Sequence, residues 1–344
     1  MKALLMEEYK KLKYADFPDP KIENPDDVLV RIKAVSICGS DVHGFDGSTG
    51  RRRPPIIMGH EAAGEVVAAG EKVKSFNKGD RITFDSTIYC GECFFCRKGN
   101  VNLCDNRMVI GVSCEEYRRH GAFAEYLVVP QRVCYHLSDN LSWEEAAVTE
   151  PAAVAAHAFR ITPVNLNDTV AVVGAGLIGL ILIDILKASI SGKIIAIDID
   201  PSRRQAALLR GVDCVFDPAD VQLNKSILEL TGGRGVDRTF EVVGATDPIK
   251  TAVSITRKGG SVTLIGNVSP TVEIPLQGVV SREISLFGSC AISGEYPLVL
   301  DLMSRKKIDV KSIISKTAPL SDGQIWFDKL YNSEDNLLKV VLIP

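Results

Sequence analysis

The sequence predicts a β-rich part joined to an α/β part that contains a parallel sheet. Residues 169–173 form a continuous, largely β-branched apolar run, which is typical of a strand buried on both faces. A glycine loop follows it, and strand-like segments then alternate with helix-like ones. In residues 1–147, short apolar alternations such as residues 28–32 are instead interrupted by Gly, Pro and Asp. We therefore expect one mixed chain of α/β and β character.

The elements expected along the chain support two domains. Strands are predicted at residues 63–70, 82–84, 169–173, 193–198, 214–216, 238–243 and 261–265, and helices at residues 203–210 and 297–306. After about residue 290 we expect only the second of these helices and a closing strand at 338–342. This tail is too short to be a domain, so we expect it to return to the N-terminal part. The predicted domains are residues 1–147 with 290–344, and residues 148–289.

Bulk properties exclude several kinds of partner. The 344 residues carry a net charge of −3, which gives no reason to expect nucleic acid or an anionic membrane. The N-terminal residues lack the apolar segment of a secretory signal, and the most apolar run, residues 177–186, is too short to span a bilayer. The nine cysteines are therefore expected to be cytoplasmic thiols or metal ligands rather than disulfides.

A first candidate metal site lies between residues 38 and 61. Cys38, His60 and Glu61 offer a thiolate, an imidazole and a carboxylate within two dozen residues, next to glycines that let the backbone turn. These ligand types suit zinc, and three of them leave one position open for water or substrate. A buried cysteine and an unrelated surface Gly-His-Glu is the alternative.

A second candidate metal site consists of four cysteines, Cys90, Cys93, Cys96 and Cys104. Their spacing is typical of a closed, tetrahedral structural zinc site. A disulfide-bonded lobe is the alternative that a reducing compartment disfavours, while iron–sulfur ligation stays open on spacing alone.

A third motif, Gly174, Gly176 and Gly179, follows a predicted buried strand and opens a helix. The first glycine permits a tight turn, the second lets the backbone approach a pyrophosphate, and the third lets helix and strand pack closely. The helix N-terminus attracts the anion. This context predicts a dinucleotide-binding site.

The choice of dinucleotide depends on charges after the next strand. Asp198 ends that strand, where it would accept hydrogen bonds from the adenosine ribose and repel a 2′-phosphate. NAD is therefore favoured over NADP. Arg203 and Arg204 lie nearby, and an arginine there could instead accommodate the phosphate.

Together these motifs resemble the zinc-dependent medium-chain dehydrogenases, and most closely their sorbitol/polyol branch. The resemblance covers essentially the whole chain and rests on residues 38–43, 59–61, the four cysteines, Glu150-Pro151 and residues 174–179. It implies a GroES-like catalytic domain, a Rossmann NAD-binding domain and a cleft between them. It also implies two zinc ions per chain, one catalytic and one structural.

The resemblance assigns roles residue by residue. Cys38 and His60 match catalytic zinc ligands, and Glu61 matches an acidic ligand or an exchangeable neighbour. Glu150 occupies the third-ligand position, where it would bind zinc directly or through water. The implied NAD-binding positions are Gly174, Gly176, Leu177, Ile178, Gly179, Asp198, Arg203, Val243 and Gly266.

Three further residues match the surroundings of the catalytic zinc. Asp41 matches the carboxylate that orients His60. Ser40 matches the hydroxyl that contacts the reacting alcohol, and His43 matches the group that passes its proton to solvent. A simply solvated loop histidine is the alternative for His43.

The expected function is hydride transfer from a secondary alcohol of a polyol or sugar derivative to NAD. The alternatives are a sugar-acid, sugar-phosphate or threonine-type dehydrogenase, and a non-catalytic nucleotide-binding relative. A homodimer or homotetramer is expected from the resemblance and from the β-prone residues 283–287, which could leave an apolar strand at a sheet edge.

Some positions depart from the sorbitol dehydrogenase pattern. Ala291 stands where those enzymes carry an arginine in the cleft, which leaves the substrate open. The run Arg51-Arg52-Arg53 is predicted to be either a solvated loop or a clamp for an anionic sugar derivative. The remaining cysteines are expected to be buried small apolar residues: Cys114, Cys134, Cys214 and Cys290.

Overall fold

The computed structural model describes residues 1–113 and 118–344, which form two compact units. Unit 1 comprises Met1–Ala153 and Ile292–Pro344, and unit 2 comprises Val154–Ala291. The chain passes from unit 1 to unit 2 between Ala153 and Val154, inside helix α4 (Thr149–Ile161). Across the described residues, every helix is too short or too polar to cross a membrane.

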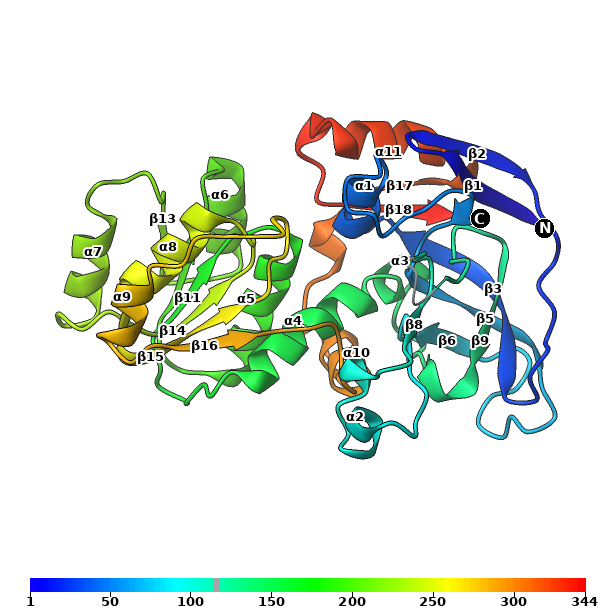
Figure 1. The fold of residues 1–344 in the computed structure, drawn as a ribbon, viewed down its shortest axis with the longest axis horizontal. Coiled ribbons are helices and arrows are strands. Elements are labelled where there is room, and N and C mark those ends of the chain that lie inside the picture. Colours follow the sequence, from blue (N-terminus) through cyan, green and yellow to red (C-terminus); the bar gives the residue numbers. More distant parts are fainter. Residues whose placement is uncertain (114–117) are drawn as a thin grey trace. The chain divides into compact units, whose positions relative to one another are not determined.

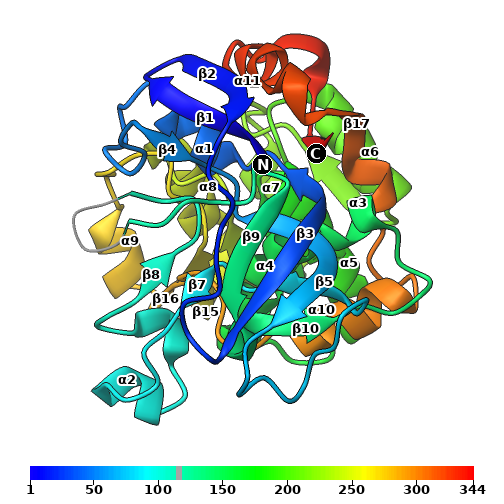
Figure 2. The same cartoon turned by 90° about the vertical axis from the view of Figure 1, so that its right-hand side faces the viewer.

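Unit 1 is built on a mostly antiparallel sheet with the strand order β10-β6-β5-β3-β18-β17, and β9 also pairs with β3 (Figures 1 and 2). Its strands are β3 (Asp27–Ser36), β5 (Glu61–Ala69), β6 (Arg81–Phe84), β9 (Tyr126–Pro130), β10 (Cys134–His136), β17 (Ile314–Pro319) and β18 (Lys339–Ile343). A smaller sheet of order β2-β1-β4 contains β1 (Lys2–Glu8), β2 (Lys11–Asp16) and β4 (Ile56–Ile57). The pair β7 (Thr87–Ile88) and β8 (Met108–Val109) completes the strands of unit 1 in the described residues.

Strand β3 organises unit 1 because it pairs with strands from three distant parts of the sequence. Val28, Val30 and Ile32 are buried at alternate positions, as expected of a strand with one face on the core. In the antiparallel pairing with β5, Ser36 at the end of β3 lies opposite Glu61 at the start of β5. The sheet therefore brings the segments around residues 38 and 60 together.

The helices of unit 1 are short and lie between and beside these strands. They are α1 (Gly39–Gly44), α2 (Phe94–Arg97), α3 (Trp143–Ala146), α10 (Tyr296–Ser304) and α11 (Gly323–Tyr331). Helix α3 begins with a capping box, in which Ser142 and Glu145 satisfy each other's backbone N–H groups.

The C-terminal tail returns to unit 1 as expected, because β18 pairs with β3. The expectation of a single helix and a single strand after residue 290 is wrong, however. Strand β17 and helix α11 also form there, and β17 pairs with β18 in parallel.

Unit 2 contains the expected parallel sheet, with the strand order β13-β12-β11-β14-β15-β16 (Figure 1). The strands are β11 (Val170–Val173), β12 (Ile194–Ile197), β13 (Cys214–Phe216), β14 (Val236–Glu241), β15 (Thr256–Leu264) and β16 (Ser285–Gly288). The helices are α5 (Leu177–Ser189), α6 (Pro201–Leu209), α7 (Leu223–Leu230), α8 (Thr246–Ile255) and α9 (Leu276–Val280). This order reverses direction next to β11, which is the position where doubly wound sheets bind dinucleotides.

Candidate functional site

The first candidate metal site forms where β3 ends and β5 begins. Cys38 precedes α1 and caps its first turn, and its sulfur accepts a hydrogen bond from the Ser40 N–H. His60 and Glu61 enter the same place from the start of β5. One ligand atom from each of Cys38, His60 and Glu61 lies within 4.8 Å of the other two. The structure thus brings together the three residues that the sequence nominated.

The buried polar atoms at this site fit a divalent cation. Glu61 Oε1 is buried and has no hydrogen-bond partner, and His60 Nδ1 faces Asp41 Oδ2 at 3.4 Å. A buried carboxylate oxygen without a partner is costly unless something positive satisfies it. Sulfur, nitrogen and oxygen donors in one group suit zinc.

Asp41 and His60 influence each other's charge. Burial alone would raise the pKa of Asp41, but His60 and Arg52 outweigh it and hold that pKa well below its usual range. Burial disfavours the charged form of His60, yet Asp41 and Cys38 hold the pKa of His60 well above its usual value. Asp41 is therefore an anion suited to orient the imidazole of His60.

Glu61 is held by two residues that the sequence reasoning missed. Its Oε2 accepts hydrogen bonds from the Ser36 hydroxyl and from Lys339 Nζ, the latter at 2.7 Å. Lys339 is only 1 % exposed and also donates to the Ile37 carbonyl at 3.0 Å. The only signal in the sequence is a lysine at the first position of the apolar closing strand β18.

Glu150 lies in the first turn of α4, outside the group formed by Cys38, His60 and Glu61. Burial raises the pKa of Glu150 to about 8, with His60 opposing the shift, and Glu61 and Asp85 adding to it. Glu150 is therefore buried near enough to His60 and Glu61 to interact with them electrostatically.

The arginine run divides into residues with different surroundings. Arg51 and Arg53 are exposed, whereas Arg52 is buried, and its guanidinium donates to Asp41 and to the Ser40 hydroxyl. Neither a solvated loop nor a clamp for an anionic substrate describes Arg52. The run of charges gave no sign that one member would be buried.

The two residues expected to handle the proton lie on α1. Ser40 and His43 are three residues apart on this helix, so they share a face, and both are exposed. Ser40 Oγ donates to Cys38 Sγ at 3.2 Å. The Ser40 hydroxyl is thus adjacent to the candidate metal ligands and still reachable from outside.

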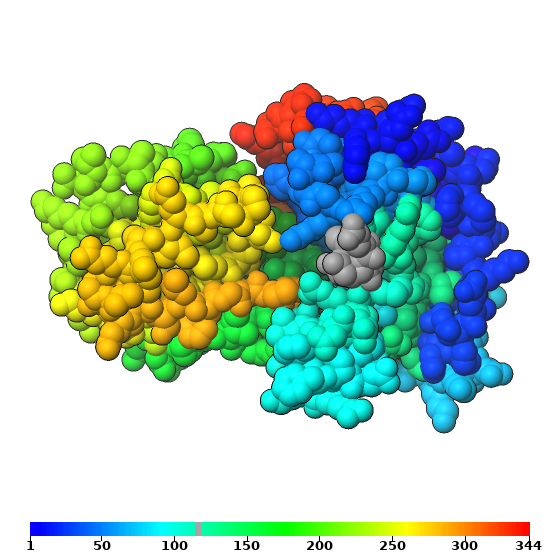
Figure 3. Space-filling model, in the orientation of Figure 1, coloured from blue at the N-terminus to red at the C-terminus, as the bar shows by residue number. Residues whose placement is uncertain are grey.

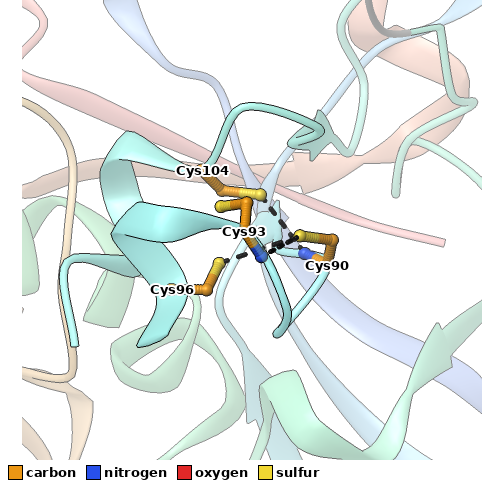
Figure 4. A group of neighbouring side chains, drawn as sticks. All are labelled: Cys90, Cys93, Cys96 and Cys104. Carbon is orange, nitrogen blue, oxygen red and sulfur yellow. Dashed lines mark hydrogen bonds between the residues drawn. The ribbon is translucent and has the colours of Figure 1, made fainter. Parts of the chain in front are cut away.

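The four cysteines converge on one point, as Figure 4 shows, and the part of unit 1 that carries them lies at the surface (cyan in Figure 3). Their four sulfurs lie within 4.8 Å of one another, and none forms a disulfide. Backbone N–H groups of Glu92 and Cys93 lower the pKa of Cys90 to about 6, which favours its thiolate, whereas burial raises the pKa of Cys96 to about 12. The geometry fits a closed tetrahedral ion.

The other cysteines differ in burial. Cys134 is buried as expected, and its sulfur donates to the Pro130 carbonyl at 3.4 Å. Cys214 and Cys290 are only partly buried, so the expectation of full burial is wrong for them. Cys114 lies outside the described residues.

The glycine loop of unit 2 has the close approaches that its motif requires. Gly174 has φ +101°, and a Cβ there would lie 2.8 Å from Val243 Cγ2. A Cβ at Gly179 would collide with the Gly174 carbonyl, and one at Gly266 would collide with the Val243 backbone. Gly176 has open space beside it, with Arg203 Nη1 4.0 Å from its built Cβ position.

Gly176 is the residue before α5, whose first turn contains Leu177 and Ile178, both partly exposed. The backbone N–H groups of this first turn have no partners within the helix. An anion such as a pyrophosphate would satisfy them, so the loop and helix fit a dinucleotide.

Asp198 lies next to this loop with a fixed orientation. Its Oδ2 accepts from the Ala175 N–H at 2.7 Å and its Oδ1 from the Asp200 N–H at 2.8 Å. Arg203 is exposed, and its Nε lies 3.9 Å from Asp200 Oδ2. The arrangement places a carboxylate and an arginine beside the loop, as the sequence predicted.

Comparison with protein families matches both units. Residues 24–139 match the alcohol dehydrogenase GroES-like domain, and residues 178–305 match the zinc-binding dehydrogenase family. The chain is 32% identical to sorbitol dehydrogenase of Bacillus subtilis (strain 168), over 100% of this chain and 97% of that protein. It is also 32% identical to D-arabitol-phosphate dehydrogenase of Enterococcus avium, over 97% of this chain and 94% of that protein.

A solved structure has the same fold. A short chain alcohol dehydrogenase from Escherichia coli CFT073, in complex with the cofactor NADH, superposes with a TM-score of 0.90 at 28% identity. The match covers 100% of this chain and 99% of that one.

Proposed function

This chain belongs to the zinc-binding dehydrogenases, in their polyol dehydrogenase branch, and we propose that it oxidises a secondary alcohol of a polyol or sugar derivative with NAD. The observation that carries the proposal is the group formed by Cys38, His60 and Glu61, with the exposed Ser40 hydroxyl beside it. These residues would hold a catalytic zinc ion, with Glu150 as a second carboxyl group nearby. The four cysteines of the lobe would hold a structural one.

The bound groups would supply two kinds of chemistry: zinc lowers the pKa of a hydroxyl group next to it, and NAD accepts a hydride. The chain's own residues do the rest. Asp41 orients the His60 imidazole, and Ser40 takes the proton of the substrate hydroxyl. His43, on the same exposed face of α1, passes that proton to solvent. Gly176, the first turn of α5 and Asp198 hold the dinucleotide.

A neutral polyol is the substrate class that we propose first. The similar proteins named above act on sorbitol and on D-arabitol phosphate, which are a neutral and a phosphorylated polyol. In this chain, Arg52 is committed to Asp41 and Ser40, so its guanidinium does not serve as an anion clamp. This leaves neutral polyols as the simplest fit to the residues near Ser40.

A screen of NAD reduction tests this proposal. The zinc-loaded protein would be assayed with neutral polyols, aldonates, polyol phosphates and threonine. We expect the highest kcat/KM for a neutral polyol, and a large loss of kcat in Ser40→Ala with zinc retained. A protein that contains both zinc ions but reduces NAD with none of these compounds would contradict the proposed function.

We also propose that Asp198 sets the preference for NAD. Asp198→Ala should increase kcat/KM for NADP, because it removes the carboxylate that repels the 2′-phosphate. One elementary charge at about 4 Å is worth roughly 1–4 kcal/mol between water and a partly shielded site. The change in NADP use should therefore be about 5- to 700-fold. A wild-type protein that already prefers NADP would assign the choice to Arg203 instead.

The chain is also proposed to form a homodimer or homotetramer. Strand β16 lies at one edge of the sheet in unit 2, and its Leu286 and Phe287 are partly buried. An edge strand of this kind leaves backbone groups ready to pair with another chain. Light scattering should give a multiple of the 37.3 kDa chain mass. A monomer mass at assay concentration would refute this proposal.

A further inference from the structure

Arg52 contacts both Asp41, which faces the metal ligand His60, and Ser40, the proposed proton-transfer residue. Its Nε and Nη2 donate to Asp41 Oδ1 at 3.0 and 2.8 Å. The same Nη2 donates to Ser40 Oγ at 3.1 Å. The side chain is 3 % exposed and Asp41 is 0 % exposed, so both groups have left water to make this contact.

The fold provides a specific passage for this side chain. Arg52 crosses Gly44, the last residue of α1, and a Cβ at Gly44 would collide with Arg52 Cγ. Gly44 has a helical backbone, so an alanine would fit the backbone itself and would disturb mainly the arginine stem. The absence of a side chain at Gly44 is therefore a local requirement of the position of Arg52.

We propose that Arg52 is a positioning residue that fixes Asp41 and Ser40 together, and so sets both the orientation of His60 and the hydrogen bonding of the Ser40 hydroxyl. The role assigned to Ser40 rests on the proposed function. The role toward Asp41 and His60 concerns metal binding and can be tested without a substrate.

The contacts divide the two oxygens of Asp41 between two tasks. Both hydrogen bonds from Arg52 go to Oδ1, which leaves Oδ2 facing His60 Nδ1 at 3.4 Å. A carboxylate held by one oxygen cannot rotate freely, so the other oxygen keeps its direction toward the imidazole. Groups that orient a metal-binding histidine in this way typically change metal affinity or activity by about 10- to 100-fold when they are lost.

The contact with Ser40 also limits what its hydroxyl can do. A serine hydroxyl has one donor and two acceptor positions. Arg52 occupies one acceptor position and the O–H donates to Cys38 Sγ, which leaves one acceptor position for the proton of a substrate hydroxyl. Held by Arg52 and by its own bond to Cys38, the exposed Ser40 hydroxyl keeps one acceptor position open for a substrate hydroxyl.

Only a guanidinium suits both contacts. Arginine presents several N–H donors in a rigid planar fork, whereas lysine offers a single compact ammonium group. Arg52→Lys keeps the buried positive charge beside Asp41 but should not hold Asp41 and Ser40 in one geometry. A role in charge balance alone would be rescued by lysine, and the proposed role would not.

The experiment compares four variants of the full-length, zinc-loaded protein. Arg52→Gln removes the guanidinium, Arg52→Lys keeps the charge, and Gly44→Ala displaces the arginine without removing it. Arg51→Gln is the matched control, because it removes a neighbouring but exposed arginine. One readout is the rate at which a chelator removes the zinc ion of the Cys38–His60 site. The others are kcat and KM for the best substrate. His60→Ala, which keeps only the four-cysteine zinc, identifies which ion is lost.

We expect Arg52→Gln, Arg52→Lys and Gly44→Ala to lose zinc from the Cys38–His60 site about 10- to 100-fold faster than wild type. Their kcat should fall by a similar factor with little change in KM, while Arg51→Gln stays within twofold in both readouts. If Arg52→Lys or Gly44→Ala loses zinc as slowly as wild type and keeps the wild-type kcat, the proposal is overturned. This holds even if Arg52→Gln fails to fold. If the wild type proves inactive with every substrate, the proposed function fails, but zinc loss still decides the role of Arg52.

Discussion

Replacing His60 with alanine should remove one zinc ion per chain and nearly all dehydrogenase activity. His60 is buried and contributes one of three ligand atoms that lie within 4.8 Å of one another, so its loss removes the only imidazole of that group. The loss should exceed the roughly 10- to 100-fold effect typical of residues that only support a ligand. Metal analysis and kcat/KM on the same sample would measure it.

A second histidine provides the control for this result. His43 lies on the exposed face of α1 and is proposed to move a proton rather than bind metal. His43→Ala should therefore keep both zinc ions and lose less activity, by about 10²- to 10⁴-fold at most for a positioned acid–base group. Full activity in His60→Ala would show that the Cys38–His60–Glu61 group is not the catalytic metal site.

Unlike His60→Ala, which should mainly lower activity, Cys93→Ser should mainly lower stability, because it removes the zinc ion of the cysteine lobe. The cysteine lobe has short elements and exposed side chains such as Phe94, so packing alone gives it little support. Loss of a structural metal belongs to the few mechanisms that cost on the order of 4 kcal/mol or more. At about 2–4 °C per kcal/mol, the melting temperature should fall by roughly 8–16 °C.

The matched control is Cys214→Ser, which changes a partly buried cysteine outside both metal groups. It should keep two zinc ions and an almost unchanged melting temperature. A single zinc ion in the wild type that Cys93→Ser leaves in place would remove the structural site from this account.

The regular parts of the fold could be predicted because their signals are local. The buried run at residues 169–173 and the alternation after it predicted the parallel sheet, and β11, β12 and β13 lie where it placed them, with β14 two residues earlier than predicted. Strand β17 escaped prediction because its residues are mostly exposed and contain Lys316 and Pro319. Helix α11 begins with Gly323, a poor helix former, and its N-cap residue Asp322 makes no side-chain capping bond, so its start was easily missed.

The candidate metal ligands could be nominated because each belongs to a compact motif, whereas the residues that support them could not. Lys339 reaches Glu61 from a strand 278 positions later in the chain, and that contact exists only once β18 joins β3. Arg52 lies in a run of charges, for which solvent is the ordinary expectation. Its burial depends on Asp41, Ser40 and the space above Gly44, which only the folded chain brings together.

Zinc removal and restoration tests the central claim most directly. NADH formation from the best polyol would be followed in the native protein, after a chelator has removed the zinc ion of the Cys38–His60–Glu61 group, and after zinc is returned. The account predicts that activity is lost with that ion and recovers with it, while the four-cysteine zinc stays bound and the fold stays intact. Undiminished polyol oxidation by protein that retains only the four-cysteine zinc would contradict it.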